Sequence, residues 1–207
     1  MSMNTAGRLN EILGSAGMEP VSLEIAERFD VYLKLLTRWN GRLNLTAIRD
    51  EEGILSRHFV ECIACARAIP EDISTLLDFG SGAGFPGIPI ALCRPEIAVT
   101  LAESQGKKAA FLQEALRTLE LQGQVFAGRA EEIARGFDCV AMRAVDRMDD
   151  AVAAAAKLVP VGGWLVLMVT GAEFPSLESV AGDFKWLDPV KLPLSEDRIV
   201  ALGRRAR

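Results

Sequence analysis

A run of apolar residues that ends in an acid and opens into four glycines, LLDFGSGAGFPGIPIAL, occupies residues 76–92. Glycine adopts backbone conformations that a Cβ atom forbids and lets the main chain approach a ligand closely. The pattern from Gly82 to Gly87 is a GxGxxG, a weak signal when it stands alone, and a tight strand-to-helix turn is the structural alternative. Open α/β sheets bind ligands at the carboxyl ends of their strands. The segment therefore predicts a ligand-binding loop at the end of a buried strand.

A second acid, Glu103, closes the next strand-like run of the chain. A carboxylate at this place can accept hydrogen bonds from both hydroxyls of an adenosine ribose, in a nicotinamide dinucleotide or in another adenosine cofactor. A dehydrogenase would also need residues that handle protons, and a chain with one histidine offers no good set. The two features together predict a site for an adenosine-containing cofactor.

The elements that position these residues change in character near residue 70. From Pro20 to Asn40 apolar residues recur at helical spacing, and Pro20 suits the first turn of that helix. Asp50, followed by two glutamates, indicates another helix start, and a further helix over 58–68 is expected to stop at Pro70. We therefore expect an N-terminal helical extension over residues 1–70.

After Pro70, strand-like and helical segments alternate. Strand-like runs are TLLDF, VTLAE, QVFAG, FDCVAMR and WLVLMVT, separated by helical segments such as KKAAFLQEALRTLE. Residues 185–194 and 197–204 are two more strand candidates. Such alternation predicts an α/β fold with a parallel sheet covered by helices, over residues 71–207.

Composition and charge narrow the class of protein. Half of the 207 residues are hydrophobic and a quarter are charged, as in one globular domain. A net charge of −5 argues against a generic nucleic-acid binder, although local basic groups such as Arg38, Arg42 and Arg49, the pair Lys107-Lys108, and the basic tail leave a polyanion partner open.

The chain is expected to be cytoplasmic. Its start lacks a basic stretch followed by an apolar block, and the most apolar region, residues 151–169, is interrupted by Lys157, Pro160 and two glycines, which argues against a membrane span. Four cysteines without a secretory signal indicate reduced thiols. Cys62 and Cys65 have CxxC spacing without a second pair, so we expect a buried helical pair and no metal.

The loop from Asp78 to Gly84 resembles the acid-x-Gly-x-Gly-x-Gly loop of class I S-adenosylmethionine (SAM) methyltransferases. Over most of its length the chain resembles the bacterial RsmG (GidB) family of rRNA small-subunit methyltransferases. The matching segments are Trp39-Asn40, NLTAIRD at 44–50, Arg57-His58-Phe59, the FPGIP continuation at 85–89, Gly106-Lys107-Lys108, Phe111-Leu112, Arg129–Glu132, Arg143-Ala144 and Asp197-Arg198. The NLTAIRD and FPGIP segments are specific to that family.

The resemblance implies a class I methyltransferase fold, Rossmann-like, with a mostly parallel seven-stranded sheet and an N-terminal helical extension. It implies transfer of a methyl group from SAM to N7 of one guanine, guanine 527, in 16S rRNA, with S-adenosylhomocysteine as the product. The expected partner is 16S rRNA within the small ribosomal subunit or its precursor, and we expect a monomer without metal.

The resemblance also assigns site residues. Cofactor contacts are expected at Asp78, Gly80, Gly82, Gly84, Phe85, Glu103, Ser104, Ala130, Glu131 and Arg143. RNA contacts are expected at Lys107, Arg129 and Arg198, and positioning roles in catalysis at Arg143, Asn44 and His58. Three places depart from the family pattern: Glu103 stands where aspartate is usual, Glu61-Cys62 replaces Asp-Ser, and Thr170 replaces a lysine.

Some of these residues have structural alternatives. His58 is either a site residue or a histidine bonded to the backbone at a helix start, and Asn44 and Thr46 either cap a turn or cover the cofactor. Arg143 pairs with a carboxylate of the cofactor or of the protein, grips an RNA phosphate, or reaches solvent.

The chemistry fits a chain without a catalytic triad. Guanine N7 carries a lone pair and no proton, so its methylation needs no general base, and positioning alone contributes roughly 7–11 kcal/mol. None of the four cysteines follows a proline, as a cytosine-C5 methyltransferase requires, and residues 142–145, MRAV, replace the Asp/Asn-Pro-Pro-aromatic motif of amine methyltransferases. The alternatives are a small-molecule methyltransferase and a non-catalytic nucleotide-binding protein that docks on RNA.

Overall fold

The computed structural model describes residues 5–206. Residues 1–4, part of the chain start considered above, and Arg207 of the basic tail lie outside the described residues. The N-terminal part is helical, as predicted. Its elements are α1 (Thr5–Ser15), α2 (Leu23–Leu43), α3 (Glu51–Gly53), a π-helical segment (Ile54–Val60) and α4 (Glu61–Ala68).

An α/β unit follows the helices. Its elements are β1 (Thr75–Phe79), α5 (Gly87–Cys93), β2 (Ala98–Ala102), α6 (Gly106–Thr118), β3 (Gly123–Phe126), a 3₁₀ turn (Ala130–Glu132), β4 (Cys139–Arg143), α7 (Met148–Lys157), β5 (Trp164–Thr170), α8 (Phe174–Val180), β6 (Phe184–Trp186), β7 (Val190–Lys191) and β8 (Arg198–Arg205).

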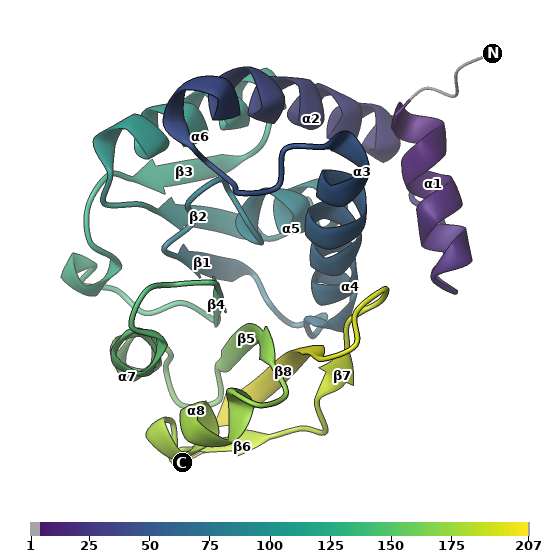
Figure 1. Cartoon of the computed structure of the whole chain (residues 1–207). Coiled ribbons are helices and arrows are strands. Elements are labelled where there is room, and N and C mark those ends of the chain that lie inside the picture. The colour runs from purple at the N-terminus through teal and green to yellow at the C-terminus, as the bar shows by residue number, and fades with distance from the viewer. Residues whose placement is uncertain (1–4, 207) are drawn as a thin grey trace.

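One sheet runs through this unit in the order β3-β2-β1-β4-β5-β8-β6 (Figure 1). The strands from β3 to β5 are parallel, and β8 pairs antiparallel with β5 and β6. The short β7 also pairs with β8, so the sheet has eight strands where seven were expected. The predicted strand over 185–194 is split into β6 and β7, with Pro189 between them; proline has no N–H for the ladder.

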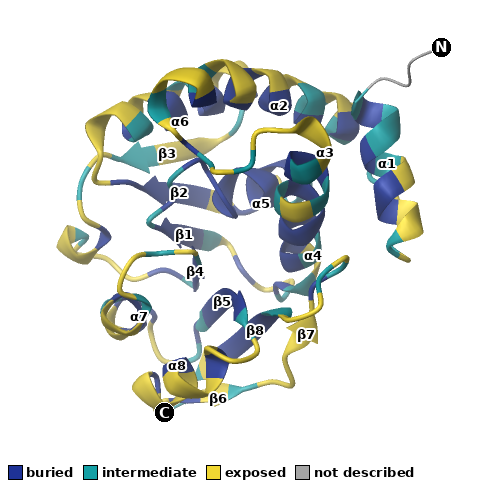
Figure 2. Cartoon of the chain, in the orientation of Figure 1, coloured by how far each residue is buried: buried dark blue, intermediate teal, exposed yellow. Residues whose placement is uncertain are grey.

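Alternating side chains place two apolar cores on opposite faces of the sheet. Leu76 and Val166 belong to the core under α2, α4, α5 and α6, whereas their neighbours Leu77 and Leu167 belong to the core under α7 and α8. Successive residues of a strand point to opposite faces, so this division follows from the strand pattern. Figure 2 shows the central strands β1, β2 and β5 largely buried, whereas β7 and the outer helix faces are exposed.

The helix α2 begins at Leu23 and not at Pro20, because the Ser22 hydroxyl accepts a hydrogen bond from the Ile25 N–H (3.3 Å) and so caps the first turn. Its buried face carries Phe29, Tyr32 and Leu36 at helical spacing, as predicted. Asn44 ends it in a left-handed conformation, with φ +48°. The helix therefore stops at the loop that leads to the cavity described below.

Asp50 caps the next helical stretch through its carboxylate, which accepts the Gly53 N–H at 2.6 Å. From Glu51 the chain stays helical to Ala68, two residues before Pro70, as predicted. Cys62 and Cys65 are buried in α4, which confirms the buried helical pair. No helix among residues 5–206 is long and apolar enough to cross a membrane.

The helical extension shares its core with the sheet. Side chains of α1, α2 and α4 belong to the same buried cluster as those of β1 and β2. Arg28 of α2 donates to the Leu119 carbonyl at the end of α6, and the half-buried Trp39 lies edge-on to Phe111 of α6 (centroids 5.8 Å apart). Residue 70 thus marks a change of architecture within one packed body, and a domain boundary there stays a prediction.

Candidate active site

The carboxyl ends of the central strands open into one cavity of about 860 Å³. Because β2 lies on one side of β1 and β4 on the other, this is the crevice where doubly wound sheets bind ligands. Its volume falls within the roughly 300–1,000 Å³ of small-molecule sites. Its walls include residues 45–48 after α2, 80–83 in the glycine loop, 102–105 after β2, 128–131 after β3 and 143–147 after β4.

The glycines of the loop do different work. Gly82 has φ +56°, and a Cβ added there would meet nothing nearer than the Gly80 carbonyl oxygen at 3.9 Å, so its open side faces the cavity. Gly84, with φ +94°, does not line the cavity, and a Cβ there would lie 2.4 Å from Ile88 Cδ1 and 2.8 Å from the Tyr32 hydroxyl oxygen. Gly82 leaves open space in the cavity, and Gly84 makes room for the protein's own core.

Glu103 ties the glycine loop to the end of β2. The residue is 6% exposed; its Oε2 accepts the Gly82 N–H at 2.9 Å and its Oε1 accepts the Gln105 N–H at 2.7 Å. Each carboxylate oxygen has lone pairs for about two hydrogen bonds, so both oxygens can still accept from a ligand.

Asp78 supports the loop from beneath. Its Oδ2 accepts the Gly87 N–H at 3.0 Å, and its Oδ1 is buried without a hydrogen-bond partner. Burial raises the pKa of Asp78 to about 7, against the lowering effect of the Gly87 hydrogen bond. Since the side chain does not line the cavity, its position is that of a support for the turn into α5.

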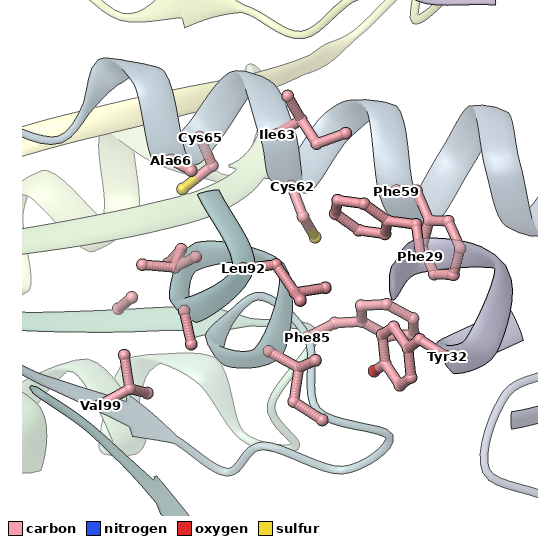
Figure 3. Close-up of a cluster of buried hydrophobic side chains, with 14 of the residues drawn as sticks. Phe29, Tyr32, Phe59, Cys62, Ile63, Cys65, Ala66, Phe85, Leu92 and Val99 are labelled. Atoms are coloured by element: carbon pink, nitrogen blue, oxygen red, sulfur yellow. The ribbon is translucent and has the colours of Figure 1, made fainter. Parts of the chain in front are cut away.

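Aromatic rings of the helical extension pack under the same loop. Tyr32 donates from its hydroxyl to the Ala83 carbonyl (2.5 Å), and its ring stacks on Phe59 with centroids 5.3 Å apart. Phe85 lies beside both rings, as Figure 3 shows. The backbone of the glycine loop is therefore held by α2 as well as by the sheet.

A buried carboxylate, Glu61 of α4, binds two arginines at the other side of the cavity. Glu61 is 1% exposed; its Oε2 lies 3.0 Å from Arg143 Nη2, and its Oε1 lies 2.6 Å from Arg198 Nη2 and 2.8 Å from Arg198 Nε. Arg143 also donates to the Arg57 carbonyl at 2.8 Å. These two ion pairs join α4 to β4 and to β8.

His58 completes this wall. Its ring stacks on Phe85 with centroids 4.6 Å apart, and its Nδ1 and Nε2 lie 3.0 Å from Arg143 Nη1 and 2.7 Å from Thr46 Oγ1. Burial, with Arg143 and other arginines nearby, lowers the pKa of His58 to about 3. The imidazole is neutral at physiological pH.

Known proteins with similar sequences agree on one family. The family model GidB, described as rRNA small subunit methyltransferase G, matches residues 25–185, more than half of the chain. The chain belongs to the GidB family. A relative from Xanthomonas axonopodis pv. citri, named Ribosomal RNA small subunit methyltransferase G, is 41% identical over 199 residues, 91% of this chain and 92% of the relative. One of the same name from Neisseria meningitidis serogroup B is 40% identical over 159 residues, 74% and 76% of the two chains.

Solved structures show the same fold at low sequence identity. TYW2 of P. horikoshii, in complex with MeSAdo, has a TM-score of 0.59 at 16% identity, over 70% of this chain and 62% of that one. TYW2 of M. jannaschii, in complex with AdoMet, has a TM-score of 0.56 at 16% identity, over 71% and 76%. These neighbours confirm the predicted class I methyltransferase fold for this GidB family member.

The cavity of the GidB family member brings together most of the residues that the sequence singled out. The predicted residues among its lining are Gly80, Gly82, Phe85, Glu103, Ser104, Arg129, Ala130, Glu131, Arg143 and His58. Five others lie off the cavity wall: Asn44, Asp78, Gly84, Lys107 and Arg198.

Asp78 and Gly84 face the protein interior, as described above, and the local structure accounts for the other three. Asn44 ends α2 and accepts a hydrogen bond from Arg49 (2.8 Å), while the residues after it line the cavity. Lys107 is exposed in the first turn of α6. The guanidinium of Arg198 is committed to Glu61, so the RNA contact expected of it stays a prediction that its geometry does not favour. Thr170, another departure from the family pattern, bonds to Glu173 at the start of α8.

Three supporting residues escaped the sequence reasoning. Glu61 was noted only as a departure, although it is an acid in an otherwise largely apolar helix segment. Tyr32 is the one tyrosine of the chain and was assigned to a buried helix face without a partner. Asn40 is buried, and its side-chain amide bonds both the N–H and the carbonyl of Thr46. No local sequence pattern predicts this contact.

The ion pair between Glu61 and Arg143 yields a prediction about the stability of Arg143→Ala. Because that variant leaves Glu61 buried with one partner fewer, we expect the free energy of unfolding to fall by about 2–4 kcal/mol. The double variant Arg143→Ala/Glu61→Gln should lose less than the sum of its single variants. Urea unfolding followed by circular dichroism measures all three.

Arg147→Ala is the matched control, since Arg147 pairs with Asp150 at an exposed site and should change stability by less than about 0.5 kcal/mol. Strict additivity of the two substitutions would show that Glu61 and Arg143 do not depend on each other.

Proposed function

We propose that this chain transfers a methyl group from SAM to N7 of one guanine in 16S rRNA, guanine 527 by family resemblance. One observation carries the choice of a ring nitrogen: His58, the histidine of the cavity wall, is neutral and both its ring nitrogens are bonded to protein groups. Asp78, whose pKa burial raises to about 7, lies off the cavity wall. The names of the relatives support a small-subunit rRNA substrate.

The cavity residues fit the cofactor. The open face of Gly82 leaves space against the loop, and Glu103 retains acceptor capacity for ribose hydroxyls. The segment Ala130-Glu131 and Ser104 line the same part of the chain's cavity after β3 and β2. When bound, SAM supplies a methyl group on a sulfonium; these residues bind and orient it.

The remaining cavity residues act by position. His58 is neutral, and both ring nitrogens have protein partners, so it is a poor proton acceptor. Burial raises the pKa of the Cys62 thiol to about 12, which makes that thiol a poor nucleophile. Guanine N7 needs neither group. Arg143 and Arg198 share the single negative charge of Glu61, which offsets part of the repulsion that Arg143 would exert as positive charge moves onto the guanine.

A basic rim supports RNA as the partner. The helices α2 and α6 run antiparallel, since Arg28 meets Leu119 and Arg38 pairs with Glu114. The end of α2 therefore lies beside the start of α6. Among residues 5–206, the rim cations Arg42, Arg57, Lys107 and Lys108 have no carboxylate within 4 Å.

We further propose that the substrate is 16S rRNA within the small subunit or its precursor, and that the chain acts in the cytoplasm as a monomer without metal. No group of three or more potential metal ligands occurs within residues 5–206. A small-molecule methyltransferase would have no use for an open basic rim. A non-catalytic RNA-docking protein would bind SAM without turnover.

The decisive experiment incubates the protein with labelled SAM and small subunits that lack the modification, followed by borohydride–aniline cleavage, which cuts RNA at 7-methylguanine. We expect label in 16S rRNA and one cleavage at the target guanine. Label without cleavage would move the methyl group to another atom, and bound SAM without label would favour the docking protein.

The two loop glycines separate cofactor binding from folding. Gly82→Ala adds a Cβ on the cavity side at a conformation that costs about 1–2 kcal/mol, so it should lower SAM affinity at least tenfold in a folded protein. Gly84→Ala, the matched variant, forces a Cβ into Ile88 and Tyr32 and should lower the free energy of unfolding by about 2–4 kcal/mol. Calorimetry and thermal melting measure the two effects; normal SAM affinity in Gly82→Ala would remove this loop from the cofactor site.

Charge reversal on the rim tests RNA docking. Lys107→Glu and Lys108→Glu should each weaken binding to small subunits and reduce the slope of log affinity against log salt by about one. SAM affinity should stay within twofold. Lys157→Glu is the control, because this substitution makes the same change of charge at the C-terminal end of α7, away from the rim. Equal effects of all three variants would place the docking face elsewhere.

A further inference from the structure

Thr46 stands on the cavity wall at a position set by its backbone. The buried amide of Asn40 accepts the Thr46 N–H at 2.9 Å and donates to the Thr46 carbonyl at 3.1 Å. These two bonds hold the backbone at Thr46 as a neighbouring strand would. They thereby fix the point on the cavity wall from which the Thr46 hydroxyl projects.

Hydrogen-bond directions can be followed from Glu61 to that hydroxyl. The guanidinium of Arg143 has donors only, and its Nη2 is bound by Glu61 and the Arg57 carbonyl, so Nη1 is held 3.0 Å from His58 Nδ1. A donor facing Nδ1 requires that Nδ1 accept. His58 Nδ1 therefore carries no proton.

A neutral imidazole with a bare Nδ1 carries its proton on Nε2. That nitrogen lies 2.7 Å from Thr46 Oγ1, so His58 donates to Thr46. The Ile48 N–H donates to the same oxygen at 3.2 Å. The lowered pKa of His58 agrees with a neutral ring.

Thr46 Oγ1 thus accepts two hydrogen bonds, and its own proton has no acceptor among residues 5–206. A hydroxyl has two acceptor lone pairs and one donor, so this one can only donate. We propose that the Thr46 hydroxyl is a fixed donor that binds an acceptor oxygen of a ligand in the cavity. It would discriminate against a donor, such as an amino group, at the same place.

The inference rests on the proposed function, which offers two sources of that oxygen: the carboxylate of SAM and the O6 carbonyl of guanine. The shared chemistry is a hydrogen-bond acceptor that faces Thr46. The two sources are separated by removing the oxygen from each ligand in turn.

The first test needs no ligand. The chain has a single histidine, so ¹⁵N-labelled histidine gives one pair of ring signals. We expect a protonated Nε2 and a bare Nδ1 between pH 8 and pH 5, with no imidazolium. A protonated Nδ1, or a ring that titrates near pH 6.5, would overturn the proposal whether or not the protein is a methyltransferase.

The second test compares Thr46→Val, which removes the hydroxyl at equal size, with Thr46→Ser, which keeps it, and a melting curve reports folding of each. The valine variant should lose roughly three- to tenfold toward a neutral acceptor and more toward a carboxylate, while serine stays near wild type. If Thr46 binds the carboxylate of SAM, the affinity for SAM should fall. If it binds O6 of guanine, kcat/KM with RNA at saturating SAM should fall.

Modified ligands then identify the partner. If the oxygen is O6, small subunits carrying 2-aminopurine at the target should be equally poor substrates for wild type and Thr46→Val; if it is the carboxylate, decarboxylated SAM should bind both equally. If Thr46→Val and the modified ligand each lowered binding or activity by its own factor, and the two factors multiplied for both ligands, a bond from Thr46 to either oxygen would be contradicted. Wild-type protein that binds SAM but does not methylate would count against the proposed function, while the binding arm and the NMR test still apply.

Discussion

The wall of the cavity depends on one buried carboxylate. Glu61 is almost fully removed from water, and an ionised carboxylate in that position costs several kcal/mol unless charged donors surround it. Arg143 and Arg198 supply those donors from two strands of the sheet. The ion pair with Glu61 orients Arg143, and Arg143 in turn orients the ring of His58 and, through it, the hydroxyl of Thr46. This side of the cavity is thus built outward from a charge that lies behind the cavity wall.

The side of the cavity formed by the glycine loop is held differently, by close packing and backbone hydrogen bonds. Glu103 accepts the Gly82 N–H from above the sheet, and Tyr32 donates to the Ala83 carbonyl from α2. The helical extension therefore helps to form the cavity. It supplies the floor of the glycine loop through its aromatic rings and one wall through the residues that follow α2.

The sequence predicted the fold well because the fold follows from local patterns: apolar spacing in α2, alternation after Pro70, and glycines at the end of β1. Most of the site residues that it named line the cavity, since motifs report positions at strand ends. It did not predict the partners of Glu61, because a contact between residues 61 and 198 depends on sheet order. Similarly, Asp78 and Gly84 belong to the motif but face the protein, a distinction that requires knowledge of what lies behind the loop.

The last strand, β8, lies in the interior of the sheet, between β5 on one side and β6 and β7 on the other. During synthesis on the ribosome, the strands on both sides of β8, namely β5 and then β6 and β7, are therefore made before β8 itself. Until then Glu61 lacks Arg198, its partner 137 positions later, and the backbone edges of β5 and β6 that face β8 are unpaired. Such distant pairings form late because loop closure must precede them. The two arginines therefore surround Glu61 only after β8 has entered the sheet.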